Sequence, residues 1–172
     1  KDLIAQRLTD ALPYVDHVVV KKRFPTTMEQ LMVVPDDFGA PESERMDLTV
    51  RSMDGVVTIA QQVQDFCLEK GIDMRRAYLS GLAMEEMAGN IVDHGFTKDK
   101  KDHAVDVRVV HKDDDVILRI KDDCVAFDPA ERLRLTPKDD PVANVGIRMI
   151  YGIAKSVEHQ NILGLNVLTV RI

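Results

Sequence analysis

The sequence predicts an α+β fold, a two-layer sandwich in which helices cover one face of a mostly antiparallel mixed sheet. Two adjacent segments with helical apolar periodicity precede two pairs of alternating segments with the pattern of hairpins. At 172 residues and 45% hydrophobic composition, the chain is long enough for one sizeable domain with an arm. We expect an N-terminal arm or linker over residues 1–45 and the domain over residues 46–172. Because the first residue is Lys rather than Met, an upstream region that the arm joins stays an open alternative.

The domain is expected to begin with a strand and a helix. Residues 46–51 alternate apolar and polar side chains, as a half-buried strand does. Residues 54–70 carry apolar side chains at every third or fourth position, which is the spacing of one helix face, and Asp54 is expected to cap this helix. Gly71 then fits the position after a helix where the backbone turns left-handed.

A second helix, capped by Asp73, is expected to run to about His94 and to stop at Gly95. Glu86 and Asn90 fall inside its apolar arc, and at four residues apart they are neighbours on one face. A carboxylate and an amide on a face that should be buried are costly unless something binds them. The pair is therefore a candidate site, and the alternative is a helix at the domain edge with both groups solvated.

The rest of the domain is expected to hold two hairpins separated by a loop and a short helix. Each hairpin strand alternates apolar and polar residues, and three consecutive aspartates form the turn of the first hairpin. The expected elements are strands over 104–111 and 116–120, a charged mobile loop with one helical turn over 130–144, a helix over 145–155, and strands over 157–162 and 166–172.

Three polar patches follow one another along these elements. Glu86-x-x-x-Asn90 lies on the second helix, Asp122-Asp123-Cys124-x-x-Phe127-Asp128 follows a strand, and Asn144-Val145-Gly146-Ile147 begins a helix. Each patch alone is a weak signal, because aspartates after a strand usually form only a turn. Together, in this order and on these elements, they form a specific pattern.

This pattern resembles the GHKL ATPase superfamily, which includes gyrase, Hsp90, the ATPase domains of histidine kinases and MutL. Within it, the chain is most similar to the bacterial anti-sigma-factor serine/threonine kinases. The three patches match the family's N box, adenine-binding box and second glycine box, and residues 164–170 look like its final strand. The resemblance covers residues 46–172, and the loop between the second and third patches is short, as in the anti-sigma kinases.

The resemblance implies a site for ATP and Mg²⁺. It implies that Asn90 holds Mg²⁺, an ion that prefers oxygen ligands, and that Glu86 is the catalytic base. It further implies that Asp122 accepts a hydrogen bond from the adenine amino group and that backbone N–H groups near Gly146 face the phosphates. The other expected nucleotide-binding residues are Asp93, Cys124, Phe127 (for which a role as core anchor is favoured over a stacking role), Val145, Ile147 and Thr169.

Two positions depart from the family's pattern. Cys124 stands where the adenine-binding box has a glycine, and Ala143-Asn144 stands where a glycine pair is common. Glycine permits positive φ and close backbone approach, and cysteine does neither easily. Either the backbone at Cys124 accommodates a side chain or nucleotide binding is weakened. The second departure implies either that the loop between the second and third patches is stiffer or that the phosphates are bound less tightly.

Composition argues against several other functions. The net charge of −6 argues against nucleic acid as the main ligand. No apolar run is long enough to span a bilayer, so we expect no membrane contact by this segment. Cys67 and Cys124 have no partner pattern and indicate free thiols in a reducing compartment, which agrees with a cytoplasmic location.

By resemblance, we expect an ATP- and Mg²⁺-dependent protein serine/threonine kinase that binds a sigma factor and phosphorylates an antagonist protein, with a homodimer as an open alternative. The other reading is a non-catalytic nucleotide-sensing or protein-binding module at the cytoplasmic end of a larger membrane or signalling protein. The N-terminal arm and Cys124 favour that reading. A histidine kinase is disfavoured, because no helical pair carrying a phosphoacceptor histidine precedes the domain.

Overall fold

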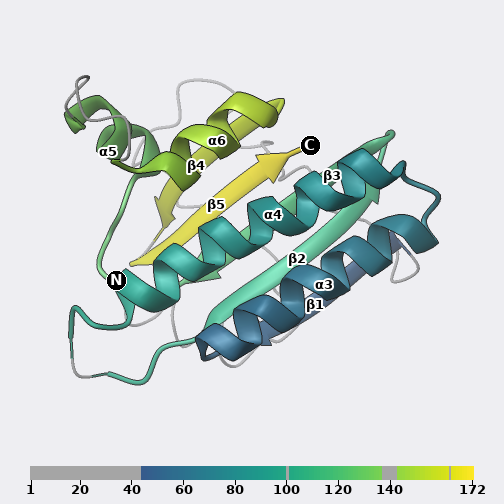
Figure 1. Cartoon of the computed structure of the whole chain (residues 1–172). Helices are drawn as coiled ribbons and strands as arrows, with labels where there is room; N and C mark the ends of the chain where they lie inside the picture. The colour runs from purple at the N-terminus through teal and green to yellow at the C-terminus, as the bar shows by residue number, and fades with distance from the viewer. Residues whose placement is uncertain (1–43, 100, 137–142, 163) are drawn as a thin grey trace, which may run out of the picture.

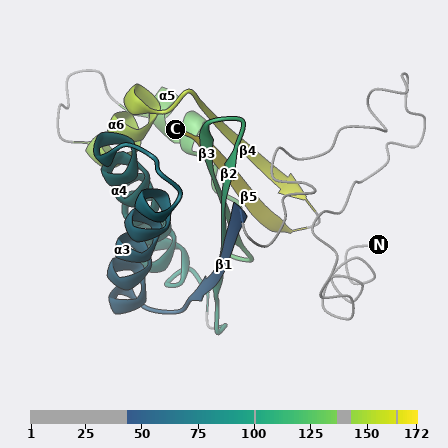
Figure 2. The same ribbon diagram turned by 90° about the vertical axis from the view of Figure 1, so that its right-hand side faces the viewer.

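The computed structural model describes residues 44–172 apart from residues 100, 137–142 and 163, so all but the last two positions of the expected arm lie outside the described residues. Five strands form one sheet in the order β1-β2-β3-β5-β4, and every neighbouring pair is antiparallel. Helices cover one face of this sheet, which gives the two layers seen edge-on in Figure 2. The α+β two-layer fold is thus confirmed. The strands are β1 (Arg45–Val50), β2 (Val105–Lys112), β3 (Asp115–Asp122), β4 (Ser156–Ile162) and β5 (Leu165–Arg171).

In the helical layer, the two long helices α3 and α4 lie side by side across the sheet (Figure 1). Every helix and strand expected within the described residues is present, and apart from the end of α4 no boundary differs by more than two residues. The helices are α3 (Met53–Glu69), α4 (Met74–Asn90), the π-helical turn η2 (Ile91–Gly95), α5 (Pro129–Leu135) and α6 (Val145–Ile153).

The two long helices begin at polar caps. Asp73 caps α4 as expected, and its Oδ1 accepts a hydrogen bond from the Arg76 N–H at 3.0 Å. The expected cap of α3 is wrong, because Ser52 takes that position and its Oγ accepts from the Gly55 N–H at 3.2 Å. Asp54 lies instead in the first turn of α3, where the helix dipole favours a carboxylate.

The second long helix changes its winding just after Asn90. It does not run unbroken to His94 as expected, because α4 gives way to η2, in which the Phe96 N–H bonds the Ile91 carbonyl at 3.1 Å. This five-residue step is the hydrogen bond of a π-helix, which occurs often at functional sites. The turn ends at Gly95, as the sequence predicts.

The core fills the space between α3, α4 and the sheet. Ile59, Met84 and Leu118 belong to one apolar cluster and are at most 2% exposed. Gly81 lets the two helices approach closely, because a Cβ there would lie 2.8 Å from the Ala60 carbonyl oxygen. In the described part of the chain, no helix has the length and apolar character needed to cross a bilayer.

Candidate functional site

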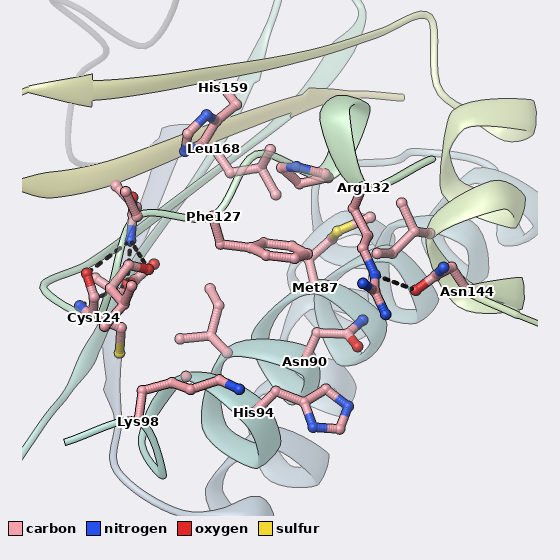
Figure 3. Close-up of a pocket in the computed structure, with 18 residues that line it drawn as sticks. Met87, Asn90, His94, Lys98, Cys124, Phe127, Arg132, Asn144, His159 and Leu168 are labelled. Carbon is pink, nitrogen blue, oxygen red and sulfur yellow. Dashed lines mark hydrogen bonds between the residues drawn. The ribbon is translucent and has the colours of Figure 1, made fainter. Parts of the chain in front are cut away.

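A pocket of about 410 Å³ lies between the helical layer and the sheet, and all three polar patches contribute to its wall (Figure 3). The predicted site residues in the wall are Asn90, Asp122, Cys124, Phe127 and Ile147, whereas Glu86, Asp93, Val145, Gly146 and Thr169 are not among the lining residues. The full lining is Met87, Asn90, Ile91, His94, Gly95, Lys98, Asp122, Cys124, Val125, Ala126, Phe127, Pro129, Arg132, Asn144, Ile147, His159, Asn166 and Leu168.

Asn90 is the last residue of α4, and a local hydrogen bond orients its amide. The Nδ2 group donates to the Glu86 carbonyl oxygen at 2.6 Å, so the Oδ1 atom is left to act as an acceptor toward the pocket. Amide and carboxylate oxygens are the ligands that Mg²⁺ takes in proteins. The orientation of this side chain therefore fits the metal-binding role that the resemblance implies.

Glu86 and Gly146 lie against each other at the N-terminus of α6. A Cβ at position 146 would lie 1.8 Å from Glu86 Oε2, so only glycine fits beside this carboxylate. The helix dipole favours an anion at this end of α6. The two residues thus meet as the order of the patches suggests, although neither is part of the pocket wall.

Asp122 ends β3 and is 5% exposed. Its Oδ1 accepts from the Cys124 N–H and from Asn166 Nδ2, both at 2.9 Å, so the carboxylate has a fixed direction. Asn166 Oδ1 in turn accepts from Asn161 Nδ2 at 2.9 Å. Asn166 is not among the predicted site residues, and the signal that could have found it is an amide among the apolar residues of β5.

Cys124 is buried, and its backbone is not in the left-handed region, so the local chain accommodates a side chain. Room for it comes from the facing turn, because a Cβ at Gly95 would lie 3.1 Å from Cys124 Sγ. Burial raises the pKa of the thiol to about 12, and the negative charge of Asp122 and Asp123 adds to the shift. The thiol is therefore protonated at neutral pH.

Asn144 precedes α6 with φ of 54°, a left-handed conformation that asparagine tolerates better than most residues. The family's glycine readily adopts positive φ, and at this position asparagine adopts positive φ instead. Its Nδ2 donates to Thr136 Oγ1 at 2.6 Å, and its Oδ1 accepts from Arg132 Nε at 3.3 Å. These bonds tie the start of α6 to α5.

The remaining predicted nucleotide-binding residues differ from one another in their exposure and in the direction of their side chains. Phe127 is 43% exposed and its ring points into the pocket, so it is not a core anchor (Figure 3). Val145 is 50% exposed, and Asp93 is an exposed residue of η2 that pairs with His94 Nδ1 at 3.4 Å. Thr169 follows Leu168 on β5, so strand alternation directs its side chain to the opposite face of the sheet.

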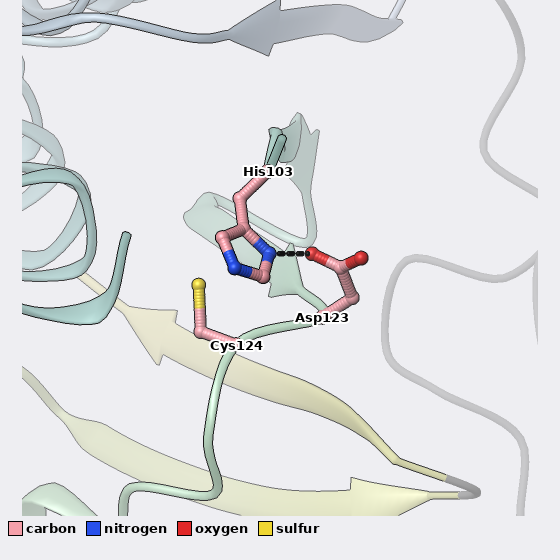
Figure 4. A group of neighbouring side chains, drawn as sticks. All are labelled: His103, Asp123 and Cys124. Carbon is pink, nitrogen blue, oxygen red and sulfur yellow. Dashed lines mark hydrogen bonds and ion pairs between the residues drawn. The ribbon is translucent and has the colours of Figure 1, made fainter. Parts of the chain in front are cut away.

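A hydrogen-bonded cluster beside the pocket was also missed by the sequence analysis. His103 is 5% exposed, and its Nδ1 and Nε2 lie 2.7 Å from Asp123 Oδ1 and from Asp99 Oδ1 (Figure 4 shows the first bond). These carboxylates raise the pKa of His103. One of its ring nitrogens, a carboxylate oxygen of Asp123 and the Cys124 Sγ lie within 4.8 Å of one another, but both ring nitrogens already bond to carboxylates. The cluster ties the segment before β2 to the segment that carries Asp122.

The pocket wall carries groups of both charges. The sheet contributes Asp122 and Asn166, whereas Lys98 and Arg132 come from the segment after η2 and from α5. The wall therefore offers both hydrogen-bond partners to a polar group and positive charge to an anion. A ligand with a polar ring and phosphate groups fits this combination.

One comparison with known proteins finds a family for this chain. Residues 50–172 match the family described as histidine kinase-like ATPase domain. Among solved structures, the histidine kinase domain of the Erythrobacter litoralis EL346 blue-light activated histidine kinase is 15% identical, with a TM-score of 0.47, over 80% of this chain and 71% of that chain. No curated protein matches this chain. Because the family match spans more than half of the sequence, this chain belongs to the histidine kinase-like ATPase family.

Proposed function

We propose that this chain is a regulatory protein kinase that transfers the γ-phosphate of ATP to a serine or threonine of an antagonist protein, as the anti-sigma-factor kinases that it resembles do. The observation that carries the proposal is the meeting of three sequence patches in one pocket, to which Asn90, Asp122 and Asn144 each come from a different patch. On this proposal the chain also binds a sigma factor, and the nucleotide in the pocket selects between the two partners.

ATP suits the pocket in size and in polarity. The volume of about 410 Å³ is in the usual range for small-molecule sites. The Asp122 carboxylate, held by Asn166, accepts the hydrogen bond of the adenine amino group, while Lys98 and Arg132 neutralise the phosphates. The Asn90 amide oxygen would hold magnesium, which would supply further positive charge to neutralise the phosphates.

In the transfer step, the substrate hydroxyl oxygen bonds to the γ-phosphorus while the bond from that phosphorus to the β–γ bridging oxygen breaks, and ADP leaves. The hydroxyl proton passes to the Glu86 carboxylate as general base. Glu86 precedes Asn90 by one helical turn, so the base and the metal-binding amide are neighbours on α4. The N-terminus of α6 at Gly146 adds backbone N–H groups that favour negative charge.

One observation favours a second function, a nucleotide-sensing module without catalysis at the cytoplasmic end of a larger membrane or signalling protein. The Glu86 carboxylate lies against Gly146 and is not part of the pocket wall. A chain in which this carboxylate never reaches a substrate hydroxyl binds ATP and changes its partner without transferring phosphate.

A phosphotransfer assay separates the two functions. The chain is mixed with ATP, Mg²⁺ and a panel of purified antagonist proteins from anti-sigma systems, and phosphoserine and phosphothreonine are measured by mass spectrometry. Glu86→Ala is the test variant. Glu85→Ala is its matched control, because Glu85 is the adjacent residue of α4 and is exposed.

We expect phosphate transfer by the parent chain and by Glu85→Ala, and a loss of about 10²–10⁴-fold in Glu86→Ala without loss of ATP binding. If the parent chain binds ATP and no antagonist in the panel is phosphorylated, the nucleotide-sensing function is supported instead. If Glu86→Ala transfers phosphate as fast as the parent, Glu86 is not the base.

A further inference from the structure

His159 lies on β4 and is part of the pocket wall (Figure 3). Its Nε2 atom is buried and has no hydrogen-bond partner, and it is the one such side-chain atom found within the described residues. A buried polar atom without a partner is costly, so it calls for an explanation. Neither the three sequence patches nor the proposed function uses this histidine.

The register of the sheet directs His159 toward the pocket. His159 pairs with Leu168 of β5, and side chains of a directly opposed pair lie on the same face of a sheet. Leu168 is buried and also lines the pocket. The imidazole therefore belongs to the sheet side of the wall, which also contributes Asp122 and Asn166.

The neighbours of His159 on the sheet are hydrogen-bonding groups. Asn161, two residues further along β4, donates to Asn166 Oδ1 at 2.9 Å, and Asn166 donates to Asp122 Oδ1 at the same distance. The cationic residues Lys98 and Arg132 come from other elements of the wall. On the proposed function, Asp122 accepts from the adenine amino group, so the part of a nucleotide that lies against the sheet is its base.

We propose that His159 is a second base-recognition residue, whose Nε2–H donates a hydrogen bond to a ring nitrogen of the adenine. This inference rests on the proposed binding of ATP. Asp122 accepts from the amino group of the base, so the remaining polar atoms of the adenine edge are ring nitrogens, which are acceptors. A neutral imidazole whose proton is on Nε2 provides the matching donor. The bound base thus satisfies the buried atom that has no partner within the protein.

The test measures ADP binding by calorimetry in the whole chain and in three variants. His159→Leu removes the donor, and His159→Gln keeps a side-chain N–H. Glu158→Gln is the matched control, because it is the adjacent exposed residue of β4, and strand alternation directs its side chain to the other face. Inorganic tripolyphosphate is titrated in parallel as a ligand without a base.

We expect His159→Leu to weaken ADP binding roughly three- to tenfold, the range for loss of one hydrogen bond. His159→Gln should recover part of this loss, and Glu158→Gln should bind as the parent does. Tripolyphosphate affinity should be the same in all four proteins. Unchanged ADP affinity in His159→Leu would overturn the proposal, since Nε2 then contributes nothing to binding of the base, and so would an equal loss for tripolyphosphate.

Two further measurements separate a failure of the proposed role of His159 from a folding defect and from a failure of the proposed function. If His159→Leu does not fold, the parent chain is titrated with ADP analogues in which one ring nitrogen is replaced by carbon. We expect one analogue to lose affinity, and equal affinity for all of them overturns the proposal. If the parent chain does not bind ADP, the proposed function fails. If it binds ADP and Asp122→Ala abolishes binding while His159→Leu does not change it, only the role of His159 fails.

Discussion

The Asp122 carboxylate is held in place by the protein itself. Its Oδ1 accepts hydrogen bonds from the Cys124 N–H and the Asn166 amide, both at 2.9 Å. All three residues are buried: Asp122 and Asn166 are each 5% exposed, and Cys124 is 6% exposed. A binding group that is already oriented loses little conformational freedom when its ligand arrives. On the proposed function, the direction of this carboxylate, more than its charge alone, sets which base edge fits.

His103 is a residue whose charge depends on folding. It lies between Asp99 and Asp123, and the hydrogen bonds to these carboxylates raise its pKa above the ordinary value of about 6.5. A group whose pKa is raised by folding stabilises the fold fully below its unfolded pKa. This contribution is lost as pH rises through the folded pKa.

We therefore expect His103→Gln to lower the free energy of unfolding by about 2 kcal/mol at pH 6, where the imidazolium bonds to two carboxylates, and by less at pH 9. Urea unfolding of parent and variant at both pH values measures the difference. His94→Gln is the control, because His94 is exposed and should show little effect at either pH. An equal loss at pH 6 and pH 9 would contradict a charged His103.

At the scale of elements, the N-terminus of α6 carries three features of the site. Asn144 supplies the left-handed residue before the helix, Gly146 leaves room for the Glu86 carboxylate, and Ile147 lines the pocket. Helix α4 supplies Glu86 and Asn90 one turn apart on the facing side. The site therefore depends on how closely α4 and α6 approach each other.

Gly146→Ala tests this approach. A methyl group at position 146 would lie 1.8 Å from Glu86 Oε2, so one of the two must move, and we expect a loss of about 1–3 kcal/mol of stability. Gly152→Ala is the control in the same helix, because no atom lies within 4 Å of a Cβ there, and it should be neutral or stabilise by about 0.5–1 kcal/mol.

Removing the Glu86 carboxylate should relieve the clash. In a Glu86→Ala background, Gly146→Ala is expected to have much less effect, and thermal unfolding of the single and double variants gives the coupling energy. Additive losses would mean that the Glu86 carboxylate does not lie beside Gly146 in solution.

Several features governed by local sequence could be predicted, although the cap of α3 was not, and features governed by strand register could not be predicted. The Asp73 cap and the Gly71 turn follow from rules over a few residues, and both are present. Asn166 meets Asp122 only because β3 and β5 pair in that register, and His159 faces the pocket only because of its pairing with Leu168. Sequence periodicity describes the faces of a single strand and does not give the pairing between strands on which both contacts depend.

The end of α4 shows a second reason for a difference. Apolar periodicity continues past Asn90 and predicts one long helix, but it cannot tell an α-helix from a short π-helical turn. The order of the three patches, by contrast, was enough to predict that Asn90, Asp122 and Ile147 lie near one another, and all three line the same pocket.

At the scale of the whole molecule, one end of the sheet borders the pocket, and the other end carries ion pairs and a hydrogen bond to the helical layer. The pocket lies where β3 ends at Asp122, while β3 begins at Asp115, whose carboxylate bonds to Lys155 and Arg171. These cations lower the pKa of Asp115. Arg76 Nη2 adds a bond at 3.0 Å to the Ile172 carbonyl, which links α4 to the end of the chain. This hydrogen bond thus joins the two layers at the end of the sheet away from the pocket. A ligand in the pocket would add contacts between the layers at the opposite end.

A nucleotide in the pocket would contact both layers and so should stabilise the whole fold. At a ligand concentration about 100 times the dissociation constant, binding adds about 2.7 kcal/mol to the free energy of unfolding, which is roughly 5–10 °C in melting temperature for a chain of this size. We expect this shift with ATP and Mg²⁺ in the parent chain and in Glu85→Gln, whose side chain is exposed. Asp122→Ala removes the bond to the base and should abolish the shift, while Asn90→Ala should abolish the part that depends on Mg²⁺. A shift of equal size in all four proteins would mean that ATP stabilises the chain from a site other than this pocket.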